Sequence, residues 1–155
     1  LEDLIAFNEA NADREMPYFG QELLIAANEM GPLTDPAYAE VKETARRLSQ
    51  EEGIDRLMEQ HGLDAIVAPT TRAAWKTDLI NGGMSSLGAS SPAAISGYPS
   101  ITLPMGYVRG LPIGMLFFGR AWSEGTLIRL AYGYEQATHH RTPARMLPTL
   151  DLRNA

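Results

Sequence analysis

The sequence predicts an α/β protein in which helices cover a β-sheet. Residues 113–118 form the run IGMLFF, which has no polar side chain and is typical of a strand covered on both faces. A second strand, residues 100–103, is bracketed by Pro99 and Pro104, because proline lacks the N–H that a strand ladder needs. A turn near residues 109–110 joins the two strands into a hairpin. Helical patterns on both sides of this hairpin supply the covering layers.

Three helices are predicted before the first strand. Apolar residues recur at helical spacing in residues 1–11 and again in residues 21–30. Asp35 is a suitable N-cap for the third helix. Gly53 interrupts that helix at a cost of about 1 kcal/mol relative to alanine. After Gly53 the same helix continues or a new helix forms, and the helical pattern ends at Gly62.

The remaining elements follow in the order strand, loop, helix, hairpin, helix. A short buried strand is predicted at residues 64–68. Residues 70–90 have no periodicity, and loops longer than about 12–15 residues are usually functional or disordered. A short helix is predicted at residues 91–97 and a long helix at residues 124–140. No linker divides the chain, so we expect residues 1–155 to form a single domain.

Composition excludes several classes of function. The chain has 155 residues, a formal net charge of -6 and no cysteine. This charge argues against nucleic acid as a partner, because phosphates need a basic surface. No apolar run approaches the roughly 20 residues of a membrane-spanning helix, so no membrane partner is expected. The absence of cysteine excludes thiolate catalysis and thiolate metal sites and fits a cytoplasmic protein.

Residues 69–78 form a candidate binding loop. They follow the end of a buried strand, and ligand sites in α/β sheets lie outside the carboxyl ends of strands. Trp75 offers a large amphipathic surface, while Thr71 and Asp78 offer polar groups that could orient an amide or an amine. The alternative interpretation is that Trp75 only packs beneath a long loop.

The histidines do not predict a metal site. His139 and His140 are adjacent at the end of the last predicted helix, where positive charge suits the helix dipole. His61 precedes the helix-ending Gly62. Neither position has further ligands at zinc-binding spacing, so we predict no bound metal.

Four segments together carry a family resemblance. They are DLIAFNEANADREMPYFGQELL at residues 3–24, DAIVAPTTRAAWKTD at 64–78, SPAAISGYPSITLPMG at 91–106, and the stretch 110–143. In this order they resemble the C-terminal part of an amidase-signature enzyme, with residues 3–24 most similar to peptide-amidase-like members. The resemblance implies a large mixed β-sheet layered with helices, in a chain about three times longer than this one. It also implies that the chain is the C-terminal fragment of a larger amidase, and that the enzyme uses no cofactor.

The same resemblance implies that the catalytic residues lie outside this chain. The family uses two serines and a lysine, with the serines in a Gly-Gly-Ser-Ser loop. Here Met84 separates the glycines from Ser85 and Ser86. Lys42 and Lys76 do not lie where the family has its lysine. We therefore predict no catalytic residue within residues 1–155.

Substrate binding is the role that the resemblance assigns to the loop after the first strand. It favours Thr71, Trp75 and Asp78 as residues that contact a small-molecule or peptide amide. The parent enzyme is then expected to hydrolyse a carboxamide to an acid and ammonia, through a Ser-Ser-Lys site located outside this fragment. Two alternatives stay open. One is a part of the glutamine-handling subunit of a glutamine-dependent amidotransferase, and the other is a non-catalytic interaction or dimerisation module.

Two expectations concern the 155 residues by themselves. They should have no amidase activity, and they should self-associate. A sheet cut from a larger one exposes an unpaired edge and an uncovered apolar face, and the apolar residues 115–118 are suited to a covered strand. Coverage of the sheet by the N-terminal helices would instead leave a monomer.

Overall fold

The computed structural model describes residues 1–76, 78, 80 and 88–144. The strands are β1 (Ile66–Pro69), β2 (Ser100–Val108) and β3 (Leu111–Phe118). The helices are α1 (Glu2–Ala10), α2 (Ala12–Glu15), α3 (Glu22–Asn28), α4 (Pro36–Ser49), the π-helix η1 (Gln50–Asp55), α5 (Arg56–His61), α6 (Ser90–Ser96) and α7 (Glu124–Thr138). No helix in the described ranges is long and apolar enough to cross a membrane.

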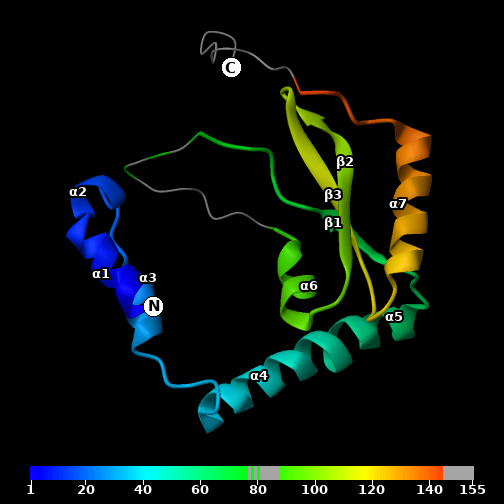
Figure 1. The fold of residues 1–155 in the computed structure, drawn as a ribbon. Coiled ribbons are helices and arrows are strands. Elements are labelled where there is room, and N and C mark those ends of the chain that lie inside the picture. The colour runs from blue at the N-terminus through cyan, green and yellow to red at the C-terminus, as the bar shows by residue number, and fades with distance from the viewer. Residues whose placement is uncertain (77, 79, 81–87, 145–155) are drawn as a thin grey trace.

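The strands form an antiparallel sheet with β3 at its centre, in the order β1-β3-β2 (Figure 1). Phe118 pairs with Ile66 on one side and with Ser100 on the other. In the turn between β2 and β3, Arg109 and Gly110 have φ angles of 51° and 79°. Positive φ at both central positions matches the right-handed twist of a hairpin. The predicted hairpin is confirmed.

One end of that hairpin differs from the prediction. Pro104 does not end β2 but pairs with Gly114, and the register shifts between Pro104 and Gly106. β2 is an edge strand of the described sheet, and proline is tolerated on edge strands and at bulges because no ladder bond is lost there. The predicted strand end after residue 103 is therefore wrong.

Helices cover both faces of β3, as the apolar run predicts. Leu116 and Phe118 pack with buried side chains of η1, α5 and α6. On the opposite face α7 lies against the sheet (Figure 1), where the rings of Phe117 and Tyr134 meet edge-on at 6.1 Å between centroids. Leu116, Phe117 and Phe118 are all buried. The layered α/β class is confirmed. The chain itself covers the apolar run on both faces, so this run does not provide the uncovered face expected for self-association.

The first three helices form an arm that stands apart from the sheet (Figure 1). Gln21 is buried within this arm. Its side-chain oxygen accepts a hydrogen bond from Asn8 at 3.1 Å, and its side-chain nitrogen donates to the carbonyl oxygen of Ile5 at 3.1 Å. The two helices predicted here are confirmed, and the short α2 is additional. The arm does not cover the sheet.

The third predicted helix begins as expected but continues as a π-helix. Asp35 accepts a hydrogen bond from the backbone nitrogen of Ala37 at 2.8 Å, which makes it the N-cap of α4. Gly53 lies within η1 rather than at a break. A Cβ atom at Gly53 would lie 2.6 Å from the carbonyl oxygen of Leu48. The widened turn therefore excludes any side chain at this position.

The π-helix also holds α6 in place. The side-chain nitrogen of Gln50 donates to the carbonyl oxygen of Ser96 at 2.6 Å. The hydroxyl of Tyr98 donates to a carboxylate oxygen of Asp55 at 2.6 Å. Burial, and then the hydrogen bond to Asp55, raise the pKa of Tyr98 to about 12. The hydroxyl therefore stays protonated at neutral pH and keeps this anchor.

Candidate functional site

A cavity of about 930 Å³ lies where β1 ends. We call it the hairpin cavity, because its wall is formed by β2 and β3 together with residues 70–71 and 141–144. In Figure 1 the chain that follows α7 passes along the tip of the hairpin. Five of the described lining residues carry a hydroxyl group: Thr70, Thr71, Thr102, Tyr107 and Thr142.

The floor of the cavity is a pair of threonine hydroxyls above a glycine. The Oγ1 atoms of Thr70 and Thr102 are 2.5 Å apart, and the backbone nitrogen of Thr70 donates to the carbonyl oxygen of Gly114 at 2.7 Å. A Cβ atom at Gly114 would lie 2.7 Å from Thr70 Oγ1 and 2.8 Å from Thr102 Oγ1. The two hydroxyls can meet only because residue 114 has no side chain.

Substitution of this glycine is expected to destabilise the protein. The methyl group of Gly114→Ala would press on both hydroxyls, and overpacking of this kind costs typically about 1–3 kcal/mol in the free energy of unfolding. Denaturant unfolding measures the change. Gly133→Ala in α7 is the matched control, because nothing lies within 4 Å of a Cβ there, and it should leave stability equal or slightly higher. Equal stability of Gly114→Ala and the unsubstituted protein would contradict the packing argument.

The rim of the cavity is closed by the chain that follows α7. The hydroxyls of Tyr107 and Thr142 are 2.5 Å apart, and the backbone nitrogen of Thr142 donates to Tyr107 Oη at 3.1 Å. These two hydrogen bonds, and more weakly the charge of Arg141, lower the pKa of Tyr107. Thr142 therefore fixes the neighbouring Arg141 beside the cavity.

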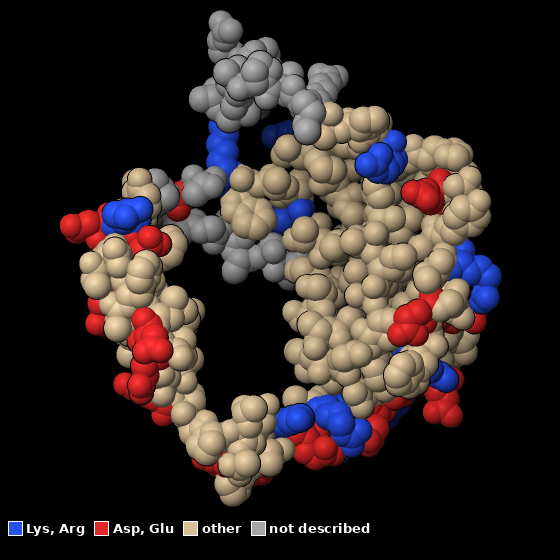
Figure 2. Space-filling model, in the orientation of Figure 1, with Lys and Arg blue, Asp and Glu red and all other residues tan. Residues whose placement is uncertain are grey.

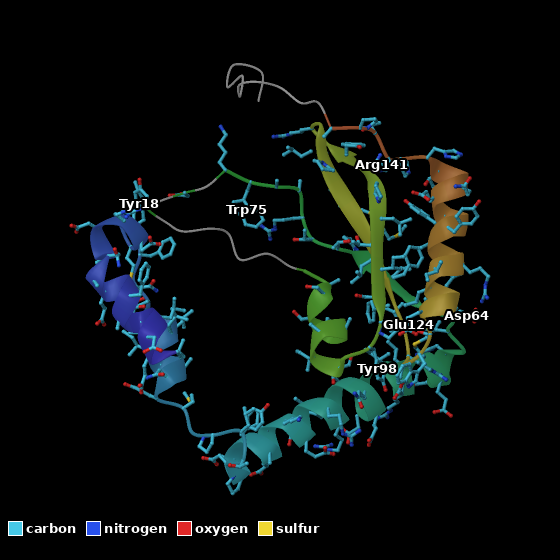
Figure 3. The ribbon with its side chains drawn as sticks, in the orientation of Figure 1. Tyr18, Asp64, Trp75, Tyr98, Glu124 and Arg141 are labelled. Atoms are coloured by element: carbon cyan, nitrogen blue, oxygen red, sulfur yellow. The ribbon has the colours of Figure 1, made fainter. Side chains whose placement is uncertain are left out.

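The structure separates the three residues that the sequence predicts as substrate-binding. Thr71 lines the hairpin cavity. Trp75 lies farther along the segment that leaves β1 (Figure 3), is 46% exposed and does not line that cavity. Asp78 also lies outside the lining, and its side chain accepts a hydrogen bond from the backbone nitrogen of Ile80 at 2.9 Å. Contact of any of the three with a substrate stays a prediction.

Sequence reasoning missed much of this cavity. Thr102, Tyr107 and Arg141 were not predicted as site residues, although all three line it. The available signal was Gly114, a glycine inside an otherwise apolar strand, since such a glycine often marks a close approach of another element.

The other candidate groups do not form a catalytic cluster in the described part of the chain. Lys42 and Lys76 are both exposed. Ser85 and Ser86 lie outside the described residues. No group of three or more His, Asp or Glu residues in the described ranges could hold a metal ion.

A second cavity, of about 550 Å³, lies between α4, α5 and α6. Its lining is mainly apolar, with Leu48, Leu57 and Ile95 among its members. Glu52 and Arg56 also line it. Nothing in the sequence predicted this cavity.

Comparison with known proteins decides the family. The sequence model described as Amidase matches residues 5–128. This chain belongs to the amidase family. The native peptide amidase from Stenotrophomonas maltophilia has a similar structure, with 49% sequence identity and a TM-score of 0.85 over 93% of this chain and 29% of that one. The predicted resemblance and fold class are therefore confirmed.

Two curated relatives extend the comparison. A probable amidase from Arabidopsis thaliana is 37% identical over 152 residues, which are 95% of this chain and 26% of the relative. A glutamyl-tRNA(Gln) amidotransferase subunit from Clostridium acetobutylicum is 44% identical over 81 residues, which are 48% of this chain and 16% of the relative. The chain thus spans about a quarter of the length of the curated amidase that it matches over nearly all of its residues.

Proposed function

We propose that this chain is part of an amidase that hydrolyses a carboxamide to a carboxylic acid and ammonia, with the C-terminal amide of a peptide as the favoured substrate. The observation that supports this most is the match to the peptide amidase from Stenotrophomonas maltophilia over 93% of the chain. The match of the Amidase family to residues 5–128 supports the general reaction. A cytoplasmic location remains part of the proposal.

The proposed chemistry uses a serine nucleophile outside residues 1–155. Its Oγ forms a bond to the carbonyl carbon, with a second serine and a lysine taking up its proton and delivering a proton to the leaving nitrogen. The C–N bond breaks, ammonia leaves, and water then cleaves the acyl-enzyme. The described residues would bind the acyl part of the substrate, in the hairpin cavity and along Thr71, Trp75 and Asp78.

The full-length protein should release ammonia from peptide amides. Peptide amides, small primary amides and matched free-acid peptides would be compared by an ammonia assay. A serine-reactive phosphonate should stop the reaction and add its mass to a serine outside residues 1–155, because the nucleophile is proposed to lie there. Failure to release ammonia from any amide, together with no labelled serine, would contradict the proposed function.

A role as part of the glutamine-handling subunit of an amidotransferase is the second candidate. The amidotransferase relative from Clostridium acetobutylicum supports it, at 44% identity over 81 residues. That match covers only 48% of this chain, whereas the peptide amidase match covers 93%. Stable co-purification of partner proteins, with glutamine as the preferred ammonia source, would favour this candidate.

A non-catalytic interaction module is the third candidate, and the reading frame separates it from both enzymes. An upstream Gly-Gly-Ser-Ser segment in the same frame supports an enzyme. A stop codon and a native start immediately before Leu1 support the module.

A further inference from the structure

The hairpin cavity has an uneven distribution of charge. Among the described residues that line it, Arg141 is the one charged side chain. No carboxylate lines the cavity in that part of the chain, although the 155-residue chain has a net charge of -6. A cation without a nearby acid makes this cavity more favourable for an anion than the rest of the surface.

Arg141 is available for a ligand. It has no ion-pair partner within the described residues, whereas Arg46 and Arg47 are both paired with glutamates. Its side chain is exposed, and Figure 3 shows it on the chain that follows α7. Its positive charge contributes to the lowered pKa of Tyr107, which is the direction expected where a negative charge is stabilised.

The backbone on both sides of Arg141 is held in place. The preceding His140 packs its ring near Tyr134, with 6.2 Å between centroids. The following Thr142 makes two hydrogen bonds to the hydroxyl of Tyr107. The guanidinium group is therefore attached to an anchored segment, which reduces the ordering cost of binding a ligand.

The remaining lining suits a peptide-sized group with a carboxylate. A volume of about 930 Å³ lies within the range of small-molecule sites. Hydroxyl groups of Thr70, Thr71 and Thr102 line the same cavity. One of the Thr70 and Thr102 hydroxyls donates to the other, and the accepting hydroxyl keeps its own proton for a carbonyl or carboxylate oxygen. Guanidinium groups bind carboxylates in a two-pronged geometry that neutral side chains cannot reproduce.

We propose that the hairpin cavity is a subsite for an acidic side chain in the acyl part of the substrate, and that Arg141 determines this specificity by pairing with its carboxylate. The proposal rests on the proposed amidase function and names the substrate class of that site. Peptide amides with an acidic residue near the amide are then the preferred substrates.

The test uses the full-length protein and matched pairs of acetylated tripeptide amides. Each pair carries Glu or Gln at one of the three positions, so that only the charge differs. At one or more of the three positions, kcat/KM and affinity should be higher for the Glu peptide than for the Gln peptide by roughly tenfold or more. A hydrogen bond to a charged group usually contributes a difference of this size. Arg141→Gln should remove this preference, so that the Glu and Gln peptides of each pair have equal kcat/KM and affinity, since a neutral side chain makes no ion pair.

Two further variants sharpen the result. Arg129→Gln is the matched control, because Arg129 is an exposed arginine of α7 outside the cavity lining, and it should keep the preference. Arg141→Lys should restore part of it. Calorimetric titration of each peptide pair gives the binding preference independently of turnover.

The outcomes separate this proposal from the proposed function. Hydrolysis without a preference for Glu at any position, or a preference that survives Arg141→Gln, overturns the subsite and leaves the amidase function standing. An Arg141-dependent binding preference without hydrolysis supports the subsite and overturns the function. Absence of both binding and hydrolysis overturns both.

Discussion

The 155-residue chain by itself is expected to hydrolyse no primary amide above the rate in buffer. The proposed nucleophile and base lie outside it, and removal of a complete catalytic serine system costs on the order of 10⁶-fold in kcat. The described lysines offer no replacement, because Lys42 and Lys76 are exposed and neither lines the hairpin cavity. The hairpin cavity has hydroxyl groups but no lysine or histidine in its described lining to accept their protons.

Purified chain, full-length protein and buffer would be compared with the same peptide amide in an ammonia assay. Ser86→Ala and Lys76→Ala in the 155-residue chain should leave the background rate unchanged. Far-ultraviolet circular dichroism confirms that each sample retains its helices. Turnover by the chain that either substitution abolishes would show that the catalytic centre has been assigned to the wrong part of the protein.

Local sequence patterns predicted those parts of the fold that a single local signal specifies. The apolar run of β3, the Asp35 cap and the turn at Gly110 each specify their own structure, and all three are present. The π-helix at Gly53 was not predicted, because only its close approach to Leu48 distinguishes a widened turn from a break. The packing of α3 against α1 within the arm was not predicted, because the hydrogen bonds of Gln21 to Asn8 and Ile5 join positions that are distant in sequence.

The candidate site was harder to predict because it is assembled from distant segments. Thr71 could be found from the strand that precedes it, and it lines the hairpin cavity. Arg141 comes from the segment after α7, and Tyr107 and Thr102 come from an edge strand. Nothing in the spacing of these residues indicates that they meet, since the hydrogen bond between Tyr107 and Thr142 spans 35 positions of sequence.

The 155-residue chain is further expected to self-associate at micromolar concentration. Large apolar side chains of the arm are exposed, among them Tyr18, Phe19 and Leu23, at 71%, 79% and 85%. Figure 2 shows acidic side chains on the outer side of the arm and mainly uncharged atoms on the side that faces the body. Apolar surface of this kind is usually buried in contacts.

An open sheet edge adds a second reason for association. β1 lies at one edge of the described sheet, and Val67 in that strand is 54% exposed. Because an edge strand presents unpaired N–H and C=O groups, it pairs readily with another chain. The buried Phe117 is not part of this surface, so the arm and the β1 edge, rather than the central strand, are the expected contacts.

Sedimentation velocity at micromolar concentration should therefore show dimers or larger species. Leu23→Glu on the arm and Val67→Lys on the β1 edge should each shift the distribution toward monomer, because both place a charge where an apolar contact is expected. Ile128→Lys is the matched control, since Ile128 is 59% exposed but lies on α7, and it should leave the distribution unchanged. A homogeneous 17.0 kDa monomer that binds no hydrophobic dye would rule out self-association, and it would mean that the exposed arm is stable without a partner.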